Sequence, residues 1–161
     1  MASPRTSGPT GAANTVGAIM TRKVVTISPD DTAADVKRML ESRRLHHLVV
    51  VGHGRVMGLV SDRDLSKCLS PFIGRRSERE QDASSLNRKV HQIMTRHVPT
   101  CRETNSIAAA GQLLLDKDVL CLPVVDAEDR CVGIVTSHDL LAWCMVRCAG
   151  AADSCAVPRA A

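Results

Sequence analysis

The sequence predicts a mixed α/β (α+β) fold in which two β-α-β-β-α repeats pack sheet on sheet about a pseudo-twofold axis. Short motifs recur in the same order in both halves of the 161-residue chain, namely Ile-Met-Thr at 19–21 and 93–95, and Gly-apolar-apolar-hydroxyl at 58–61 and 133–136. Each repeat has only about 50 residues, too few to bury one face of its own sheet well. We therefore expect the two sheets to cover each other.

The composition is that of a globular chain with an ordinary core. Apolar residues make up 44% and charged residues 24%. The net charge is only +4, and the chain has one Phe, one Trp and no Tyr, so a nucleic acid would find few rings on which its bases could stack. No apolar stretch approaches the roughly 20 residues of a membrane helix. Neither a nucleic acid nor a membrane is expected as a partner.

The first repeat is predicted to span 16–69. Its expected elements are a lead-in helix at 16–20, an extended segment ending at Thr26, a helix from Thr32, strands at 47–51 and 55–60, and a closing helix from 62 to about 69. The helix is predicted from Val36, Met39 and Leu40, whose spacing places them on one face. A Gly-His-Gly turn joins the two strands.

The second repeat is predicted to span 90–147 and to copy the first. Its expected elements are a lead-in helix at 90–94, an extended segment ending at Thr100, a helix from near Ser106, strands at 120–125 and 130–135, and a closing helix from 137 to about 147. Ile107, Ala110 and Leu114 share one face of the first long helix. The remaining residues are predicted to be a disordered tail at 1–15, a charged linker at 70–89 and a flexible tail at 148–161.

Each repeat closes with a hydroxyl-x-x-Asp motif, Ser61 to Asp64 and Thr136 to Asp139, where a strand hands over to a helix. The start of a helix offers free N–H groups and a positive dipole end, which suit an anion such as phosphate. A carboxylate one turn into the helix suits the two hydroxyls of a ribose. The alternative interpretation is a capping box that only satisfies the helix end, for which Thr32 and Asp35 provide a probable example in this chain.

Taken together, these motifs resemble the tandem CBS-domain pair, or Bateman module. The matching stretches are 19–21, 25–26, 48–51 and 58–65 in the first half and 93–95, 122–126 and 133–140 in the second. The likeness covers roughly 16–147. The pattern is most similar to stand-alone bacterial CBS-pair proteins of the acetoin-utilisation-like type.

The resemblance implies a non-enzymatic regulatory protein that binds AMP, ADP, ATP or S-adenosylmethionine in the cleft between the repeats, with no cofactor and no metal. It implies that Asp64 and Asp139 take the ribose hydroxyls and that the adenine is held by strand backbone. Ser61 and Thr136 would lie on the phosphate side, beside Arg63 and His138. The implied ligand-binding residues are Thr26, Ile27, His47, Leu48, Val49, Gly58, Ser61, Arg63, Asp64, Thr100, Cys101, Leu122, Pro123, Gly133, Thr136, His138 and Asp139. The expected partners are a second copy of the chain and an unidentified regulated protein.

The cysteines leave one alternative open. Seven cysteines, an odd number, without an export signal favour a reduced, cytoplasmic setting. Cys144 and Cys148 lie one helical turn apart and Cys155 follows them, so the alternative function is a metal or redox sensor. No Ser/His/Asp or Cys/His arrangement of a nucleophilic enzyme is legible, so catalysis is not expected.

Overall fold

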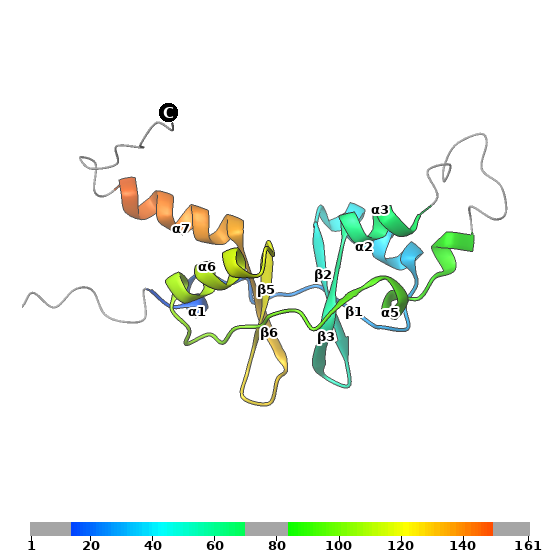
Figure 1. The fold of residues 1–161 in the computed structure, drawn as a ribbon, viewed down its shortest axis with the longest axis horizontal. Coiled ribbons are helices and arrows are strands. Elements are labelled where there is room, and N and C mark those ends of the chain that lie inside the picture. Colours follow the sequence, from blue (N-terminus) through cyan, green and yellow to red (C-terminus); the bar gives the residue numbers. More distant parts are fainter. Residues whose placement is uncertain (1–13, 70–83, 150–161) are drawn as a thin grey trace, which may run out of the picture.

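The computed structural model describes residues 14–69 and 84–149, and predictions that fall on other residues lie outside it. Figure 1 shows two sheets back to back at the centre of the molecule, with helices on their outer sides. The elements are α1 Val16–Ile19, β1 Thr26–Ile27, α2 Ala33–Arg43, β2 His47–Gly52, β3 Arg55–Ser61, α3 Asp62–Cys68, η2 Ser85–Asn87, α5 Val90–Ile93, β4 Thr95–Arg96, α6 Ile107–Asp116, β5 Cys121–Val125, β6 Cys131–Thr136 and α7 Ser137–Ala149. The predicted two-repeat α/β architecture is confirmed.

The two sheets follow one plan. In the first, the strand order is β1-β2-β3-β4, with β1 parallel to β2 and the other pairs antiparallel. In the second, β5 pairs antiparallel with β6. Isolated bridges complete this sheet: Cys101 pairs in parallel with Val124, as β1 does with β2, and Thr21 pairs antiparallel with Ile134, as β4 does with β3.

The lead-in segments are exchanged between the repeats. Helix α1 begins the first repeat in sequence, yet Val16 and the adjoining Met20 pack in the core of the second, against Leu122 and Val135. Helix α5 precedes the second repeat and places Val90 and Met94 in the core of the first. The sequence predicts each lead-in helix with the segment that follows it, and this is wrong, because local periodicity does not encode a distant partner. As a result, each core is completed by the other repeat.

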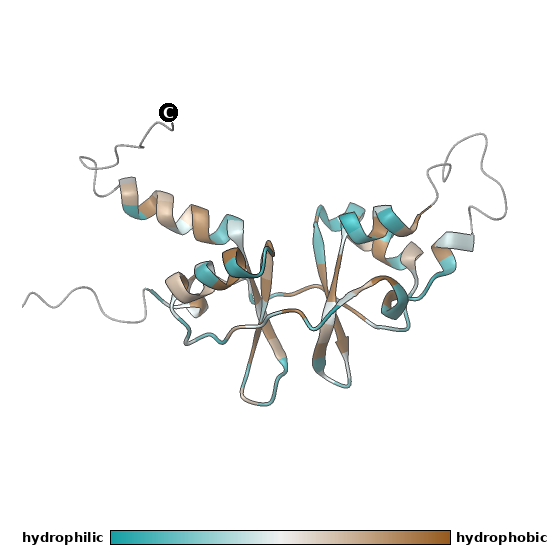
Figure 2. Cartoon of the chain, in the orientation of Figure 1, coloured by the Kyte–Doolittle hydropathy of each residue, from teal (hydrophilic) through white to brown (hydrophobic). Residues whose placement is uncertain are grey.

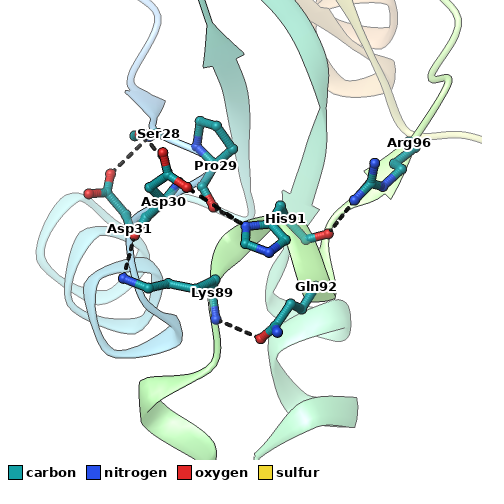
Figure 3. Close-up of polar contacts among 8 residues, drawn as sticks. All are labelled: Ser28, Pro29, Asp30, Asp31, Lys89, His91, Gln92 and Arg96. Atoms are coloured by element: carbon teal, nitrogen blue, oxygen red, sulfur yellow. Dashed lines mark hydrogen bonds and ion pairs between the residues drawn. The ribbon is translucent and has the colours of Figure 1, made fainter.

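Hydrogen bonds fix this exchange, as Figure 3 shows around α5. The Val90 amide donates to the Asp31 carbonyl at 2.9 Å and the Lys89 Nζ donates to the Asp30 carbonyl at 2.8 Å. The His91 amide and its Nδ1 both lie 3.0 Å from the Pro29 carbonyl oxygen. On the other side, the Val16 amide donates to the Asn105 carbonyl at 2.9 Å.

A third cluster joins the sheets. Val49, Leu59 and Cys121 are buried between them, with Val51, Ile134 and other partly buried residues around them. Figure 2 shows the hydrophobic colour along the central strands, while the hairpin turns are hydrophilic. The expected packing of sheet on sheet is therefore present, and it forms a continuous seam between the two repeats.

Candidate functional site

Two open cavities lie along the seam, and each draws its walls from both repeats. The first cavity, of about 430 Å³, is lined by Thr21, 23–25, 44–47, Leu120, Ile134 and 136–139. The second cavity, of about 500 Å³, is lined by His46, His47, Leu59, 61–64, Lys67, Thr95, Val98 and 118–121. The walls correspond pairwise through the pseudo-twofold axis, since Thr21 matches Thr95 and Asp139 matches Asp64 in the repeated motifs.

The second cavity contains the start of α3. The Asp64 Oδ2 accepts hydrogen bonds from the Ser61 amide at 3.0 Å and from the Ser61 hydroxyl at 2.7 Å, and the Asp64 amide donates to the Ser61 Oγ at 3.2 Å. This is a complete capping box. The helix begins here because β3 ends in a residue that can cap it.

The first cavity contains the same arrangement at the start of α7. The Asp139 Oδ2 accepts from the Thr136 amide and the Thr136 hydroxyl, both at 2.8 Å, and the Asp139 amide donates to the Thr136 Oγ at 3.2 Å. Both hydroxyl-x-x-Asp motifs therefore form capping boxes, as the alternative interpretation of the sequence predicted. In both cases the cap occupies Oδ2, and within the described parts of the chain no donor reaches Oδ1.

A third capping box shows what a plain cap looks like. At the start of α2, the Asp35 Oδ2 accepts from the Thr32 amide at 3.1 Å and from the Thr32 hydroxyl at 2.6 Å. Here the other oxygen is also engaged, because the Arg38 guanidinium donates to the Asp35 Oδ1 at 2.7 Å. Asp35 lines neither seam cavity. The two aspartates in the cavities differ from it by keeping one carboxylate oxygen unengaged.

Seven of the residues implied by the resemblance line the cavities. They are His47, Ser61, Arg63, Asp64, Thr136, His138 and Asp139. The structure brings them together in two groups, with His47 in the walls of both cavities.

The other implied residues line neither cavity. Leu48, Val49, Leu122 and Pro123 are fully buried in β2 and β5, and Ile27 belongs to the first core. Burial raises the pKa of the Cys101 thiol to about 11. Thr26 and Thr100 are exposed and line neither cavity.

The two implied glycines make room for the exchanged segments. A Cβ on Gly58 would collide with the Thr95 carbonyl oxygen on β4, and a Cβ on Gly133 would lie 2.6 Å from the Met20 Sδ. Glycine lets β3 and β6 accept a neighbour at this distance. Their place in the motif is thus explained by packing of the lead-in segments.

Many residues of the cavity walls were not predicted from the sequence as ligand-binding residues. They are Thr21, Lys23, Val24, Val25, Arg44, Leu45, His46, Leu120, Ile134 and Ser137 in the first cavity, and Leu59, Asp62, Lys67, Thr95, Val98, Asp118, Val119, Leu120 and Cys121 in the second. The repeated Ile-Met-Thr motif was a usable signal for Thr21 and Thr95. Arg44 and Asp118 lie just after α2 and α6 with positive φ, and no sequence motif predicts their position in the walls.

Two histidines separate the cavities. His46 and His47 line both, and the His46 Nδ1 lies 2.9 Å from the Asp62 Oδ2. This hydrogen bond lowers the pKa of Asp62 below its usual range. Burial lowers the pKa of His47, although the charge of Asp62 acts in the opposite direction. The His47 side chain, which both cavities share, is therefore mainly neutral near pH 7.

The cysteines give no support to a metal or redox sensor. Cys144 and Cys148 are exposed on α7, and Cys155 lies outside the described residues. Across 14–69 and 84–149, no three His, Cys, Asp or Glu side chains come together as a metal site. Burial raises the pKa of the Cys121 thiol to about 12, which keeps it protonated and unreactive. In the same part of the chain, none of the helices has the length and apolar character needed to cross a bilayer.

The family model for the CBS domain matches twice, over residues 16–71 and 90–145. A CBS domain-containing protein of Dictyostelium discoideum is 32% identical over 125 residues, which cover 76% of this chain and 86% of that protein. Protein MJ1225 of Methanocaldococcus jannaschii is 29% identical over 77% of this chain. This chain spans only 45% of the length of MJ1225.

Solved structures are similar over most of the chain. CBSX2 in complex with AMP has a TM-score of 0.69 at 25% identity, covering 83% of this chain and 98% of that one. The cytosolic domain of the Mg²⁺ channel MgtE in complex with ATP has a TM-score of 0.64 at 29% identity, covering 80% and 48%. The CBS pair of protein MJ0100, in complex with 5′-methylthioadenosine and S-adenosyl-L-methionine, has a TM-score of 0.64 at 26% identity, covering 80% and 97%.

An acetoin utilization protein, AcuB of Vibrio cholerae, shares the fold with a TM-score of 0.69 at 22% identity, covering 88% of this chain and 98% of that one. The two matched ranges of the family model coincide with the two repeats of the structure. The chain belongs to the CBS-domain family and carries one CBS domain in each half.

Proposed function

We propose that this protein is a non-enzymatic regulatory module that binds adenine nucleotides or S-adenosylmethionine in the two seam cavities. The observation that carries the proposal is the unengaged Oδ1 of Asp64 and Asp139, each held by a capping box at the edge of an open cavity. Three similar structures were determined with AMP, with ATP, or with 5′-methylthioadenosine and S-adenosyl-L-methionine.

The walls supply the contacts that a nucleotide needs. The unengaged Oδ1 of each aspartate can accept hydrogen bonds from ribose hydroxyls. Ser61 and Thr136, with Arg63 and His138 beside them, form the phosphate side. Adenine is held by aliphatic side chains and backbone groups, since the apolar walls are Val24, Val25, Leu45, Leu120 and Ile134 in the first cavity and Leu59, Val98, Val119, Leu120 and Cys121 in the second. The buried residues Ile27, Leu48, Val49, Cys101, Leu122 and Pro123, with Gly58 and Gly133, contribute by building the strands behind these walls. Thr26 and Thr100 belong to the extended segments that run beside those strands.

Signalling follows from the position of the cavities. Each cavity is lined by both repeats, so a ligand that contacts both walls favours one relative arrangement of the repeats over others. A regulated protein that distinguishes these arrangements would then respond to the ratio of adenine nucleotides, which is a form of energy sensing.

The proposed assembly is a homodimer in the cytoplasm. Leu141, Met145 and Val146 on α7 are exposed by 61%, 66% and 76%, and Leu115 on α6 by 78%. Such apolar side chains on neighbouring helices are suited to a second copy of the chain. The cysteines of the described residues are free thiols, which accords with a reduced compartment.

The test is ligand binding by the double variant Asp64→Asn, Asp139→Asn. Calorimetry and thermal unfolding with AMP, ADP, ATP and S-adenosylmethionine should identify a ligand that stabilises the natural protein by about 2.7 kcal/mol at a hundred times its dissociation constant. The asparagine side-chain oxygen can still accept from the Ser61 or Thr136 amide and keep the capping box. Its NH2 group cannot accept from ribose hydroxyls, so the double variant should fold and lose most of this stabilisation.

Asp35→Asn is the matched control, because it alters an equivalent capping box outside the cavities. It should keep the full ligand response. If the double variant responds as strongly as the control, the two carboxylates serve as helix caps alone.

A further inference from the structure

The two cavities carry opposite charges at one equivalent position. Arg44 follows helix α2 and Asp118 follows helix α6 at the equivalent position, and both residues adopt a left-handed backbone, with φ of 52° and 50°. Arg44 lines the first cavity and Asp118 lines the second. The pseudo-twofold axis therefore superposes a guanidinium on a carboxylate.

The other formal charges of each wall cancel, so this position sets the net charge of each cavity. The first cavity has two cations, Lys23 and Arg44, and one carboxylate, Asp139. The second cavity has two cations, Arg63 and Lys67, and three carboxylates, Asp62, Asp64 and Asp118. His46 and His47 belong to both walls, while His138 belongs to the first. With neutral histidines, the first cavity carries one excess cation and the second one excess carboxylate.

The cations of the first cavity are available to a ligand. Within the described residues, the ion pairs are those of Arg22, Arg38, His46, His91 and Arg130 with acidic partners. Neither Lys23 nor Arg44 takes part in them, and Asp118 is likewise unpaired in that range. An arginine without a partner suits phosphate because its planar fork can donate two hydrogen bonds to one phosphate.

We propose that the two cavities select different adenosine compounds: the first takes a polyphosphate nucleotide, and the second takes an adenosyl ligand with no phosphate or with a positive charge. Arg44 and Asp118 are the residues that set this choice. A triphosphate is attracted by the excess cation of the first cavity and repelled by the excess carboxylate of the second. A neutral thioether is not repelled in the second cavity, and a positively charged sulfonium is attracted there. This inference rests on the proposed function and assigns a ligand class to each cavity.

The experiment uses the full chain, with ATP and 5′-methylthioadenosine as probes in metal-free buffer, followed by calorimetry. In the natural protein, 5′-methylthioadenosine should still bind after saturation with ATP. Arg44→Asp should lower the affinity for ATP about tenfold, with the affinity for 5′-methylthioadenosine unchanged within about twofold. Asp118→Arg should let ATP compete with 5′-methylthioadenosine.

Both substitutions suit the backbone, because each introduces the residue that already occupies the same left-handed conformation in the other repeat. Lys23→Asp is a second variant of the first cavity, on an exposed residue, and should also weaken ATP binding. Arg43→Asp and Asp116→Arg are matched controls, since they change the same charges next to these positions but line neither cavity. Neither control should alter the affinity for either probe by more than about twofold.

The outcomes separate the two proposals. If ATP occupies both cavities with equal affinity, or if Arg44→Asp and Arg43→Asp weaken ATP binding equally, the selection is overturned while nucleotide binding stands. If neither probe binds the natural protein, and no nucleotide of the wider panel binds, the proposed function fails and the selection fails with it.

Discussion

Asp35, Asp64 and Asp139 accept almost the same capping hydrogen bonds through Oδ2. They differ at Oδ1, which is bonded to Arg38 in Asp35 and is unengaged in Asp64 and Asp139. The residue three positions later explains part of this difference. Arg38 pairs with Asp35 at this spacing, and Ala142, three residues after Asp139, has no charge. Lys67, three residues after Asp64, is a cation, but it is not among the ion-paired residues of the described chain. A capping box in sequence thus leaves two roles open, and the position one turn later separates them only where its side chain pairs with the aspartate, as Arg38 does.

At the same scale, His47 should make the stability of the protein depend on pH. Burial lowers the pKa of His47 in the folded state below the ordinary value of 6.5. The unfolded chain therefore binds a proton at a higher pH than the folded chain, and the free energy of unfolding falls as the pH drops below 6.5 toward the folded-state pKa. Above 6.5 both states are neutral at this residue, so the contribution levels off.

His47→Gln should flatten this part of the pH profile. Urea unfolding of both proteins across the mildly acidic range measures the difference, and groups common to both cancel in the comparison. Identical slopes in the two proteins would show that the half-buried ring titrates normally.

At the scale of elements, the sequence predicted local structure better than distant partners. The long helices, the strand pairs and the closing helices appear where the apolar spacing and the repeated motifs placed them. The exchange of α1 and α5 was not predicted, because a four-residue helix carries no local information about which sheet it will cover. For the same reason, Thr21 and Thr95 were not predicted as wall residues, since they reach the cavities through that exchange.

The ligand-binding residues show the same division. The hydroxyl-x-x-Asp motifs fall in the cavity walls because a strand-to-helix junction is a local feature. The extended segments at Thr26 and Thr100 lie away from the walls. Arg44 and Asp118, which follow helices α2 and α6 with positive φ, line the cavities instead. Such positions are defined by three-dimensional packing of the repeats, which a single sequence does not display.

The exchange gives a prediction in which each lead-in variant weakens the opposite repeat. Val16→Ala removes two methyl groups from a fully buried site in the second core, at a cost of about 2–3 kcal/mol. Hydrogen exchange should then lose protection mainly in β5 and β6, with β2 and β3 affected less.

Val90→Ala is the mirror-image control, because Val90 is equally buried in the first core. It should reduce protection mainly in β2 and β3. A larger loss in β2 and β3 from Val16→Ala would mean that each lead-in helix stays with its own repeat in solution.

At the scale of the whole molecule, the seam between the sheets is both the packing interface and the binding region. Val49, Leu59 and Cys121 fill it, and Leu59 and Cys121 also belong to the wall of the second cavity. A ligand in that cavity therefore contacts the residues that hold the repeats together. Opening of the seam and binding at the seam should be coupled in free energy.

The Cys121 thiol can report this coupling. It is only 2% exposed and its pKa is raised to about 12 by burial, so it reacts with a thiol reagent only when the seam opens. Cys101 is the control, because it is buried in the core of the second repeat, away from the cluster that joins the sheets. Pulsed alkylation read by mass spectrometry should label Cys121 faster than Cys101 in the free protein, since seam opening requires less unfolding than exposure of a core.

A saturating nucleotide should slow the labelling of Cys121 more than that of Cys101, whereas the exposed Cys144 and Cys148 should react at the same rate with and without ligand. Equal rates at Cys121 and Cys101 would mean that the repeats separate only on global unfolding. In that case the relative movement of the repeats would not be available as a signal, and regulation would have to act through local changes at the cavity walls.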